Sequence, residues 1–152
     1  MFRGFSSVSI DAKGRMAIPA RFREQLTQRG TNQLVVTLNP WDKCLWLYPL
    51  PEWQAVDAKL QQLSDFDKQS RRTKQVIRGY ANDCVCDGQG RVLLPQELRD
   101  FAGIDKRAVV LGQGNKFEIW EEGLWAAQRD EWLQGVGAED APASPILGSL
   151  SL

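Results

Sequence analysis

A thirteen-residue frame occurs twice in this chain of 152 residues, once over residues 11–23 and once over residues 87–99. In both copies Asp, Gly, Arg, Pro and a second Arg stand at the same spacing, Asp-x-x-Gly-Arg-x-x-x-Pro-x-x-x-Arg. This regularity indicates one supersecondary unit built twice from one chain. Because two units of this length are too short to bury separate full cores, we expect the copies to share one core.

The same order of elements is expected around each copy of the frame. Alternating apolar residues predict a strand, a Gly-containing turn follows, a short extended segment comes next, and a proline starts a helix that leads to a hairpin. In the first copy these segments are 5–10, 11–14, 16–18, 19–26, 34–38 and 44–48. In the second copy they are the strand at Val85, then 87–90, 92–94, 95–101, 108–111 and 117–120. The simplest interpretation is strand, turn and strand within each copy.

Further helices are predicted between and after the two copies. Apolar residues at helical spacing form a seam for packing on another helix, namely Trp53, Val56, Leu60 and Leu63. A second helix is predicted over 67–81, and its cations Arg71, Lys74 and Arg78 favour a solvated basic face over direct contact with phosphates. A last helix is expected over 122–133, followed by a flexible, proline-broken tail. The predicted organisation is a first repeat at 5–51, linking helices at 52–80, a second repeat at 81–124, a C-terminal helix at 125–134 and a tail at 135–152.

Composition weighs against several classes of protein. The chain has no histidine, so Ser-His and Cys-His catalytic arrangements are absent, and we expect no enzyme. Cys84 and Cys86 stand as Cys-x-Cys without a second pair, which cannot readily supply the four ligands of structural zinc, so neither a metal nor a cofactor is expected. The odd count of three cysteines favours reduced thiols. With no apolar run of about 18 residues and no signal peptide, no membrane contact and a cytoplasmic location are expected.

Charge is distributed unevenly although the formal net charge is zero. Residues 1–80 carry 13 Lys and Arg against 7 Asp and Glu, whereas residues 81–152 carry 6 against 12. Such asymmetry allows a local basic surface that meets phosphates, and it equally permits packing of basic on acidic surfaces between subunits.

The Asp-x-Lys-Gly-Arg-x-x-x-Pro sequence at 11–19 resembles the SpoVT/AbrB superfamily of bacterial DNA-binding proteins. Two copies in one chain, together with residues 1–4 and 47–53, the predicted helical pair at 52–81 and residues 110–120, resemble the MraZ family of regulators over residues 1 to about 133. The resemblance implies an α+β, mainly β fold, a pseudo-symmetric double swapped-hairpin barrel with a helical pair between the copies. It also implies a ring-shaped homo-oligomer on the nucleoid. This oligomer would bind double-stranded DNA at tandem operator repeats and repress the division and cell-wall gene cluster, including its own gene.

The family's Asp-x-x-x-Arg signature, implicated in DNA binding, maps onto Asp11 and Arg15 and onto Asp87 and Arg91. A Gly-Arg turn lets the backbone approach DNA while the guanidinium reaches a guanine edge or a phosphate. Arg15 and Lys13 are therefore the first candidates for DNA contact, and the others are Arg91, Arg3, Arg21 and Arg23. In the second copy Gln89 replaces Lys13, so that turn lacks one charge.

The aspartates and glycines of the frame are predicted to shape the turns instead of contacting DNA. A carboxylate repels phosphate, and an Asx-type bond to nearby amides explains Asp11 and Asp87 better. Gly14 and Gly90 belong to the same turns. The structural alternative for Arg15 is that it pairs with Asp11 and only braces the hairpin.

Two other functions stay open at this stage. In one, the chain is an antitoxin-like interaction module whose tryptophan-bearing helices bind a protein, and DNA binding is secondary. The other is an enzyme with the repeat mates Asp11 and Asp87 as paired carboxylates, which is disfavoured because each has an Arg four residues on that would keep it ionised.

Overall fold

The computed structural model describes residues 1–137 and 144–151. It divides into two compact units, Met1–Glu122 and Gly123–Leu152. The first unit holds both copies of the frame.

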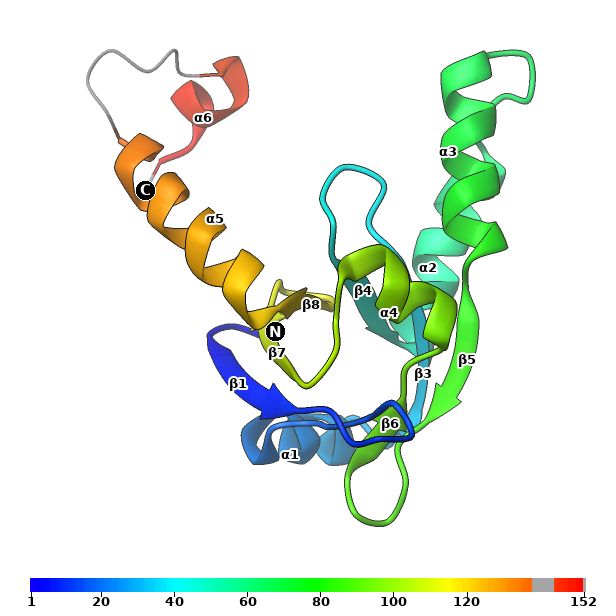
Figure 1. The fold of residues 1–152 in the computed structure, drawn as a ribbon. Helices are drawn as coiled ribbons and strands as arrows, with labels where there is room; N and C mark the ends of the chain where they lie inside the picture. The colour runs from blue at the N-terminus through cyan, green and yellow to red at the C-terminus, as the bar shows by residue number, and fades with distance from the viewer. Residues whose placement is uncertain (138–143, 152) are drawn as a thin grey trace. The chain divides into compact units, whose positions relative to one another are not determined.

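Strands of the first unit build one large sheet and one small ribbon (Figure 1). Six strands form an antiparallel sheet of order β1-β7-β8-β4-β3-β5, and β2 pairs with β6 alone. The strands are β1 Phe5–Ser9, β2 Arg15–Ala17, β3 Gln33–Leu38, β4 Leu45–Pro49, β5 Asn82–Val85, β6 Arg91–Leu93, β7 Arg107–Gly112 and β8 Phe117–Glu121. The predicted hairpins are confirmed as β3–β4 and β7–β8.

Three of the four helices of the first unit begin directly after a proline, and α3 begins after Asp67, whose side chain accepts the N–H of Ser70. Pro19, Pro49 and Pro95 stand immediately before α1, α2 and α4 with extended backbone. A proline has no N–H to satisfy and its φ is fixed, so it suits a helix start. The helices of the first unit are α1 Ala20–Gln28, α2 Leu50–Gln61, α3 Lys68–Gly79 and α4 Gln96–Ala102. The four helices predicted over this region are therefore confirmed.

The two copies interleave instead of folding as separate hairpins. β1 pairs with β7 of the second copy and is linked to its own β2 only by a bridge between Ile10 and Met16. β2 in turn pairs with β6, its counterpart in the other copy. The predicted order of strand, turn and strand is confirmed in each copy, but each of these strands pairs mainly with a strand of the other copy. The local alternation that predicts a strand carries no information about which distant strand it pairs with.

The expected barrel is also corrected. Within the described residues the large sheet is open, with β1 at one edge and β5 at the other. β2 and β6, of three residues each, pair with each other and do not bridge those edges. The fold is thus a mixed, mainly antiparallel β structure with helices, and the copies share one core as predicted.

One face of the sheet packs on a core that both copies supply. Alternate residues of the strands point into it, together with apolar residues from α1, α4, β2 and β6. Its centre is aromatic, since the ring centroids of Phe2 and Phe117 lie 4.2 Å apart and those of Phe22 and Phe117 lie 4.8 Å apart. This core holds the β2–β6 ribbon against the sheet through Met16 and Val92, which are both buried.

The opposite face of β3 and β4 packs on α2 and α3. The predicted seam of Trp53, Val56, Leu60 and Leu63 lies here, in a second cluster with Trp46, Tyr48 and Ile77. Because helices or ribbon cover both faces of these strands, β3 and β4 consist of almost continuously buried residues.

Cations of α3 bind neighbouring segments of the first unit. Lys74 Nζ lies 2.5 Å from an Asp65 oxygen, and Arg78 Nε lies 2.7 Å from an Asp57 oxygen. Arg71 donates to the Asp65 carbonyl oxygen at 2.6 Å. All three cations are thus engaged with the α2–α3 pair and its connection, which differs from the expected solvated basic face.

The second unit contains α5 Glu122–Gly135, which starts at the boundary, and α6 Pro145–Ser149. α5 confirms the predicted last helix, and on it the rings of Trp125 and Trp132 pack edge to face at 5.8 Å. The short helix α6 is capped by Ser144 and was not expected. Residues 138–143 and 152 of the predicted flexible tail lie outside the described part of the chain, so its flexibility stays a prediction.

Truncating the aromatic centre of the core tests the shared-core description. Phe22 is 1% exposed and contacts Phe2 and Phe117 from α1. Phe22→Ala is expected to lower the free energy of unfolding by about 3–5 kcal/mol, since it removes buried ring contacts and leaves a cavity. Urea denaturation measures it, with Phe66→Ala as control, because Phe66 is 100% exposed. Equal losses in both variants would contradict the described core.

Candidate nucleic-acid interface

The two turns of the frame have the same backbone geometry. In the first, Asp11 N–H donates to Arg15 O and Gly14 N–H donates to Asp11 O, both at 3.0 Å. In the second, the equivalent bonds of residues 87–91 are both 2.9 Å. Gly14 and Gly90 have φ values of +85° and +76°, in the left-handed region that favours glycine. The repeated glycine is therefore required by the turn itself.

An aspartate side chain closes each turn. Asp11 Oδ1 accepts the N–H groups of Lys13 at 3.0 Å and Arg15 at 2.9 Å, while Oδ2 accepts Nε–H of Arg15 at 2.7 Å. Asp87 makes the same three bonds with Gln89 and Arg91, at 2.9, 2.9 and 3.1 Å. Each carboxylate thus organises its turn and orients the arginine that follows.

These bonds favour the ionised carboxylates. The backbone N–H of Arg15 donating to Asp11 holds the pKa of that carboxyl below its usual value, with further help from the Arg15 side chain and the Lys13 N–H. The pKa of Asp87 is lowered in the same way, chiefly by the N–H of Arg91. Both aspartates therefore stay charged beside their arginines near neutral pH.

Arg15 and Arg91 lie on the paired ribbon, in β2 and β6, and are both partly exposed. Asp11 binds Arg15 through Nε, and in the described part of the chain the terminal nitrogens Nη1 and Nη2 of Arg15 have no hydrogen-bond partner. A guanidinium held this way is braced by the turn and can still present its outer edge to a ligand. The bracing interpretation and the contact interpretation are thus compatible.

Asp11 also receives a cation from the other copy. Arg91 Nη1 lies 3.8 Å from Asp11 Oδ2, in addition to the bond from Arg91 to its own Asp87. The first carboxylate therefore faces two arginines. Together with the exchange of Lys13 for Gln89, this makes the two turns chemically different.

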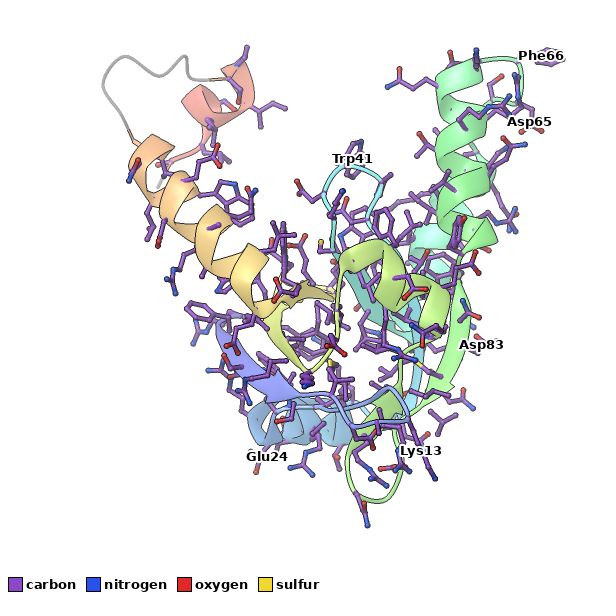
Figure 2. The ribbon with its side chains drawn as sticks, in the orientation of Figure 1. Lys13, Glu24, Trp41, Asp65, Phe66 and Asp83 are labelled. Atoms are coloured by element: carbon purple, nitrogen blue, oxygen red, sulfur yellow. The ribbon has the colours of Figure 1, made fainter. Side chains whose placement is uncertain are left out.

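Lys13 is exposed at the first turn and its side chain projects outward (Figure 2). Only its backbone N–H is used by the turn, in the bond to Asp11. In the described residues its ammonium has no ion pair, so it is available to an anion.

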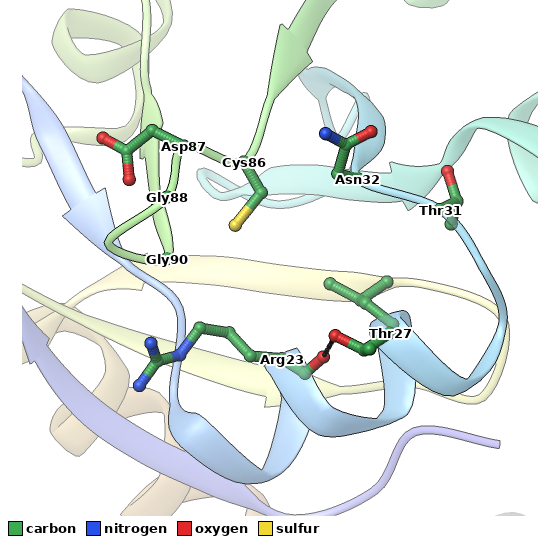
Figure 3. A pocket seen from close by; sticks show the side chains of 9 residues that line it. Arg23, Thr27, Thr31, Asn32, Cys86, Asp87, Gly88 and Gly90 are labelled. Atoms are coloured by element: carbon green, nitrogen blue, oxygen red, sulfur yellow. Dashed lines mark hydrogen bonds between the residues drawn. The ribbon is translucent and has the colours of Figure 1, made fainter.

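The remaining predicted cations are divided between two other places. Arg21 Nη2 donates to Phe5 O at 2.8 Å and to Ser6 Oγ at 2.9 Å, which ties α1 to β1. Arg3 is exposed and lines the same hollow as Arg21. Arg23 lies against the second turn, where it borders a pocket of about 400 Å³ with Cys86 and Gly90 (Figure 3). The structure therefore groups Arg3 with Arg21 and puts Arg23 beside the other copy's turn.

Arg99 is a residue near the site that the sequence analysis did not select. It belongs to α4, and its guanidinium covers Gly14, where an added Cβ would lie 2.6 Å from Arg99 Cζ. Its Nε donates to Leu94 O at 2.9 Å. The signal was present in the sequence, because Arg99 is the repeat mate of Arg23 in the last position of the frame.

The described residues contain neither a candidate metal cluster nor a candidate membrane-spanning helix. No group of three or more Cys, Asp or Glu side chains there has the arrangement of a metal site. In the same residues, no helix combines the length and the apolar character needed to cross a bilayer.

Removing the charge of Asp11 tests its part in the turn. A carboxylate whose pKa is lower in the folded state than in the unfolded chain stabilises the fold at pH values above its unfolded pKa. That stabilisation is lost as the pH falls through the folded pKa. Asp11→Asn is therefore expected to be less stable than the unaltered chain at about pH 7, with the difference shrinking as the pH falls below the usual pKa of an aspartate and through its lowered folded pKa. Thermal unfolding across this range measures it, with Asp105→Asn, on an exposed bend, as control. A difference independent of pH would contradict the ionised turn.

Adding a methyl group at Gly14 separates backbone strain from the contact with Arg99. Gly14→Ala and Gly30→Ala both place alanine at positive φ, but a Cβ at Gly30 has no atom within 4 Å. Both variants are expected to lose about 1–2 kcal/mol from the left-handed backbone. Gly14→Ala is expected to lose about 1 kcal/mol more, because Arg99 must leave its bond to Leu94 O. Urea denaturation compares them, and equal losses would show that Arg99 does not depend on the bare glycine.

Comparison with known proteins agrees with the repeated architecture. The profile of the family described as "MraZ protein, putative antitoxin-like" matches twice, at residues 1–76 and 77–141. Proteins called transcriptional regulator MraZ are similar over essentially the full length of both chains. That of Thioalkalivibrio sulfidiphilus is 47% identical over 152 residues, with 100% of each chain covered. That of Methylococcus capsulatus is 49% identical over 154 residues, with 99% of each covered. That of Halorhodospira halophila is 45% identical over 152 residues, again with 100% of each covered. With two matches that span most of its length and full-length relatives this similar, the chain belongs to the MraZ family.

Proposed function

We propose that this protein is a transcriptional regulator that binds double-stranded DNA through the β2–β6 ribbon and its first turn. One observation carries the proposal. Asp11 holds the guanidinium of Arg15 through Nε and leaves its terminal nitrogens unbonded in the described residues, next to the exposed Lys13, on a short two-stranded ribbon. Two-stranded ribbons are among the elements that fit into a groove of DNA. The names of the relatives support the same class of function.

The chemistry of this turn suits a nucleic acid. The outer edge of a guanidinium donates two parallel hydrogen bonds to guanine O6 and N7, or to a phosphate. Anchoring Arg15 through Nε leaves that edge intact and limits the freedom of the side chain before binding. Lys13 adds a point charge for a phosphate. Arg91, Arg3, Arg21 and Arg23 are proposed as secondary contacts, and Asp11, Gly14, Asp87 and Gly90 as the residues that set the turns.

A single ribbon offers few ion pairs, so useful affinity requires several subunits on successive sites. We therefore propose a ring-shaped homo-oligomer that grips tandem operator repeats upstream of the division and cell-wall gene cluster. There it would repress that cluster, including its own gene, in the cytoplasm at the nucleoid. We also interpret the reciprocal pairing of the copies as the swapped-hairpin arrangement of the SpoVT/AbrB superfamily.

A second candidate function rests on a different surface. Trp41 is 74% exposed in the β3–β4 loop (Figure 2). With Tyr80 and Phe101 it borders a hollow of about 430 Å³. An exposed aromatic cluster of this kind suits contact with another protein. It supports the antitoxin-like interaction module as the alternative, with DNA binding secondary.

Fluorescence anisotropy tests the DNA-binding function. The probe is a labelled duplex with the tandem repeats upstream of the protein's own operon, titrated over a salt series. Arg15→Ala is expected to weaken binding about 10- to 100-fold, since a good bidentate contact is worth about 1–3 kcal/mol. The matched control is Arg107→Ala, because Arg107 also pairs with a carboxylate, Glu122, at 2.8 Å but lies outside the ribbon.

The outcomes separate the two candidates. Strong binding that falls steeply with salt, lost in folded Arg15→Ala but retained in Arg107→Ala, supports the regulator. If Arg15→Ala binds as well as the unaltered chain, or neither binds, the interaction module takes precedence. Equal affinity for one repeat and for the tandem array would overturn the oligomeric grip.

A further inference from the structure

Each copy of the frame places its last arginine on the glycine of the other copy. Arg99, from the second copy, covers Gly14, and Arg23, from the first, covers Gly90. An added Cβ would lie 2.6 Å from Arg99 Cζ at Gly14, and 2.5 Å from Arg23 Nη1 at Gly90. The exchange is reciprocal, so each turn is packed by a side chain from far along the chain: Arg99 is 85 residues from Gly14, and Arg23 is 67 residues from Gly90.

Two successive hydrogen bonds connect Arg99 to the first turn through Leu94. Its Nε donates to Leu94 O at 2.9 Å, and Leu94 N–H donates to Gly14 O at 2.9 Å. The helix that carries it is held in the core by Leu98 and Ala102, which are both buried. Arg99 therefore joins a rigid helix, the end of β6 and the glycine before Arg15.

The two reciprocal contacts are not equivalent. Arg99 is partly buried and hydrogen-bonded, whereas Arg23 is exposed, borders a pocket and has no side-chain hydrogen bond in the described residues (Figure 3). The better-held arginine covers the turn that carries Lys13, and the other covers the turn with Gln89 in that place. Arg91 adds a second cation from the second copy beside Asp11. The second copy thus supplies the first turn with a hydrogen-bonded arginine and a further cation. The first copy supplies the second turn with Arg23, which has no side-chain hydrogen bond in the described residues.

We infer that Arg99 is a positioning residue for DNA binding: from the second copy it fixes the first turn so that Lys13 and Arg15 meet the DNA together. This inference rests on the proposed DNA-binding function. It makes the second copy a support for the first, which explains why the frame keeps its last arginine where the charged residue of the turn is lost.

The test uses the full chain and the labelled tandem-repeat duplex. Arg99→Met keeps much of the length and apolar bulk but removes the Nε donor and the charge, while Arg99→Lys keeps the charge without the planar group. The matched control is Arg107→Met, because Arg107 also donates through Nε, to Glu122 at 2.8 Å, but lies outside the ribbon and is not a proposed DNA contact. Arg99→Met and Arg99→Lys are expected to weaken binding about tenfold, a change of about 1.4 kcal/mol. Arg107→Met is expected to change binding less than about threefold.

A double-variant cycle with Lys13→Ala separates positioning from direct contact. If Arg99 acts through the first turn, Arg99→Met reduces the DNA affinity by a smaller factor in the Lys13→Ala background than in the unaltered chain. The two factors are expected to differ at least about threefold. Additive effects together with rescue by Arg99→Lys would make Arg99 itself a phosphate contact and overturn the inference. Equal losses of binding in Arg99→Met and Arg107→Met would overturn it as well, since the loss would then follow from removing any arginine bonded through Nε.

Stability and the wider proposal are controlled in the same experiment. Thermal unfolding of each variant shows whether it is folded at the assay temperature. If Arg99→Met is unfolded at that temperature, the milder Arg99→Lys takes its place. Weaker binding by Arg99→Lys than by the unaltered chain is the expected result. If the unaltered chain does not bind the duplex, or Arg15→Ala binds equally well, the proposed function itself fails, whatever the Arg99 variants do.

Discussion

Hydrogen bonds exchanged between the two copies are the constraint on which the rest of the structure depends. Ile18 N–H donates to Gly90 O at 2.8 Å, Leu94 N–H donates to Gly14 O at 2.9 Å, and β2 pairs with β6 between them. A ribbon of two three-residue strands is not stable alone in water. It persists here because Met16 and Val92 are buried in the common core. The turns that carry the candidate site are therefore held by tertiary contacts instead of by their own local structure.

Duplication with interleaving lets the copies diverge without losing the fold. Both turns retain the bonds that their backbone requires, from Asp11 and Asp87 and through Gly14 and Gly90. The side chains that do not shape the turn differ, as Lys13 and Gln89 do. Each copy completes the packing of the other, so a loss of charge in one turn leaves the structural exchange in place. This division permits one copy to specialise in contact and the other in support.

The elements and the candidate site were predictable to different degrees. Helix starts after Pro19 and Pro95 and the two hairpins follow from local rules, and they agree with the structure. The pairing of β1 with β7 and the open sheet do not follow from local rules, because the alternation of apolar residues is the same whichever strand lies alongside. The contact of Arg99 with the first turn could not be predicted for a related reason. Its neighbour Gly14 is distant in sequence, and only the fold brings them into contact.

The sequence by itself determined the turns, the helix starts and the amphipathic faces, since these depend on interactions within a few residues: an aspartate with the amides that follow, a glycine at positive φ, a proline before a helix. It also determined that two equivalent units are present. Only the tertiary structure decided which units exchange strands, which arginine covers which glycine, and that Asp11 faces two arginines whereas Asp87 faces one. The physical reason is that short strands and long cationic side chains find their neighbours through burial in a common core, and that choice is made between residues far apart in the chain.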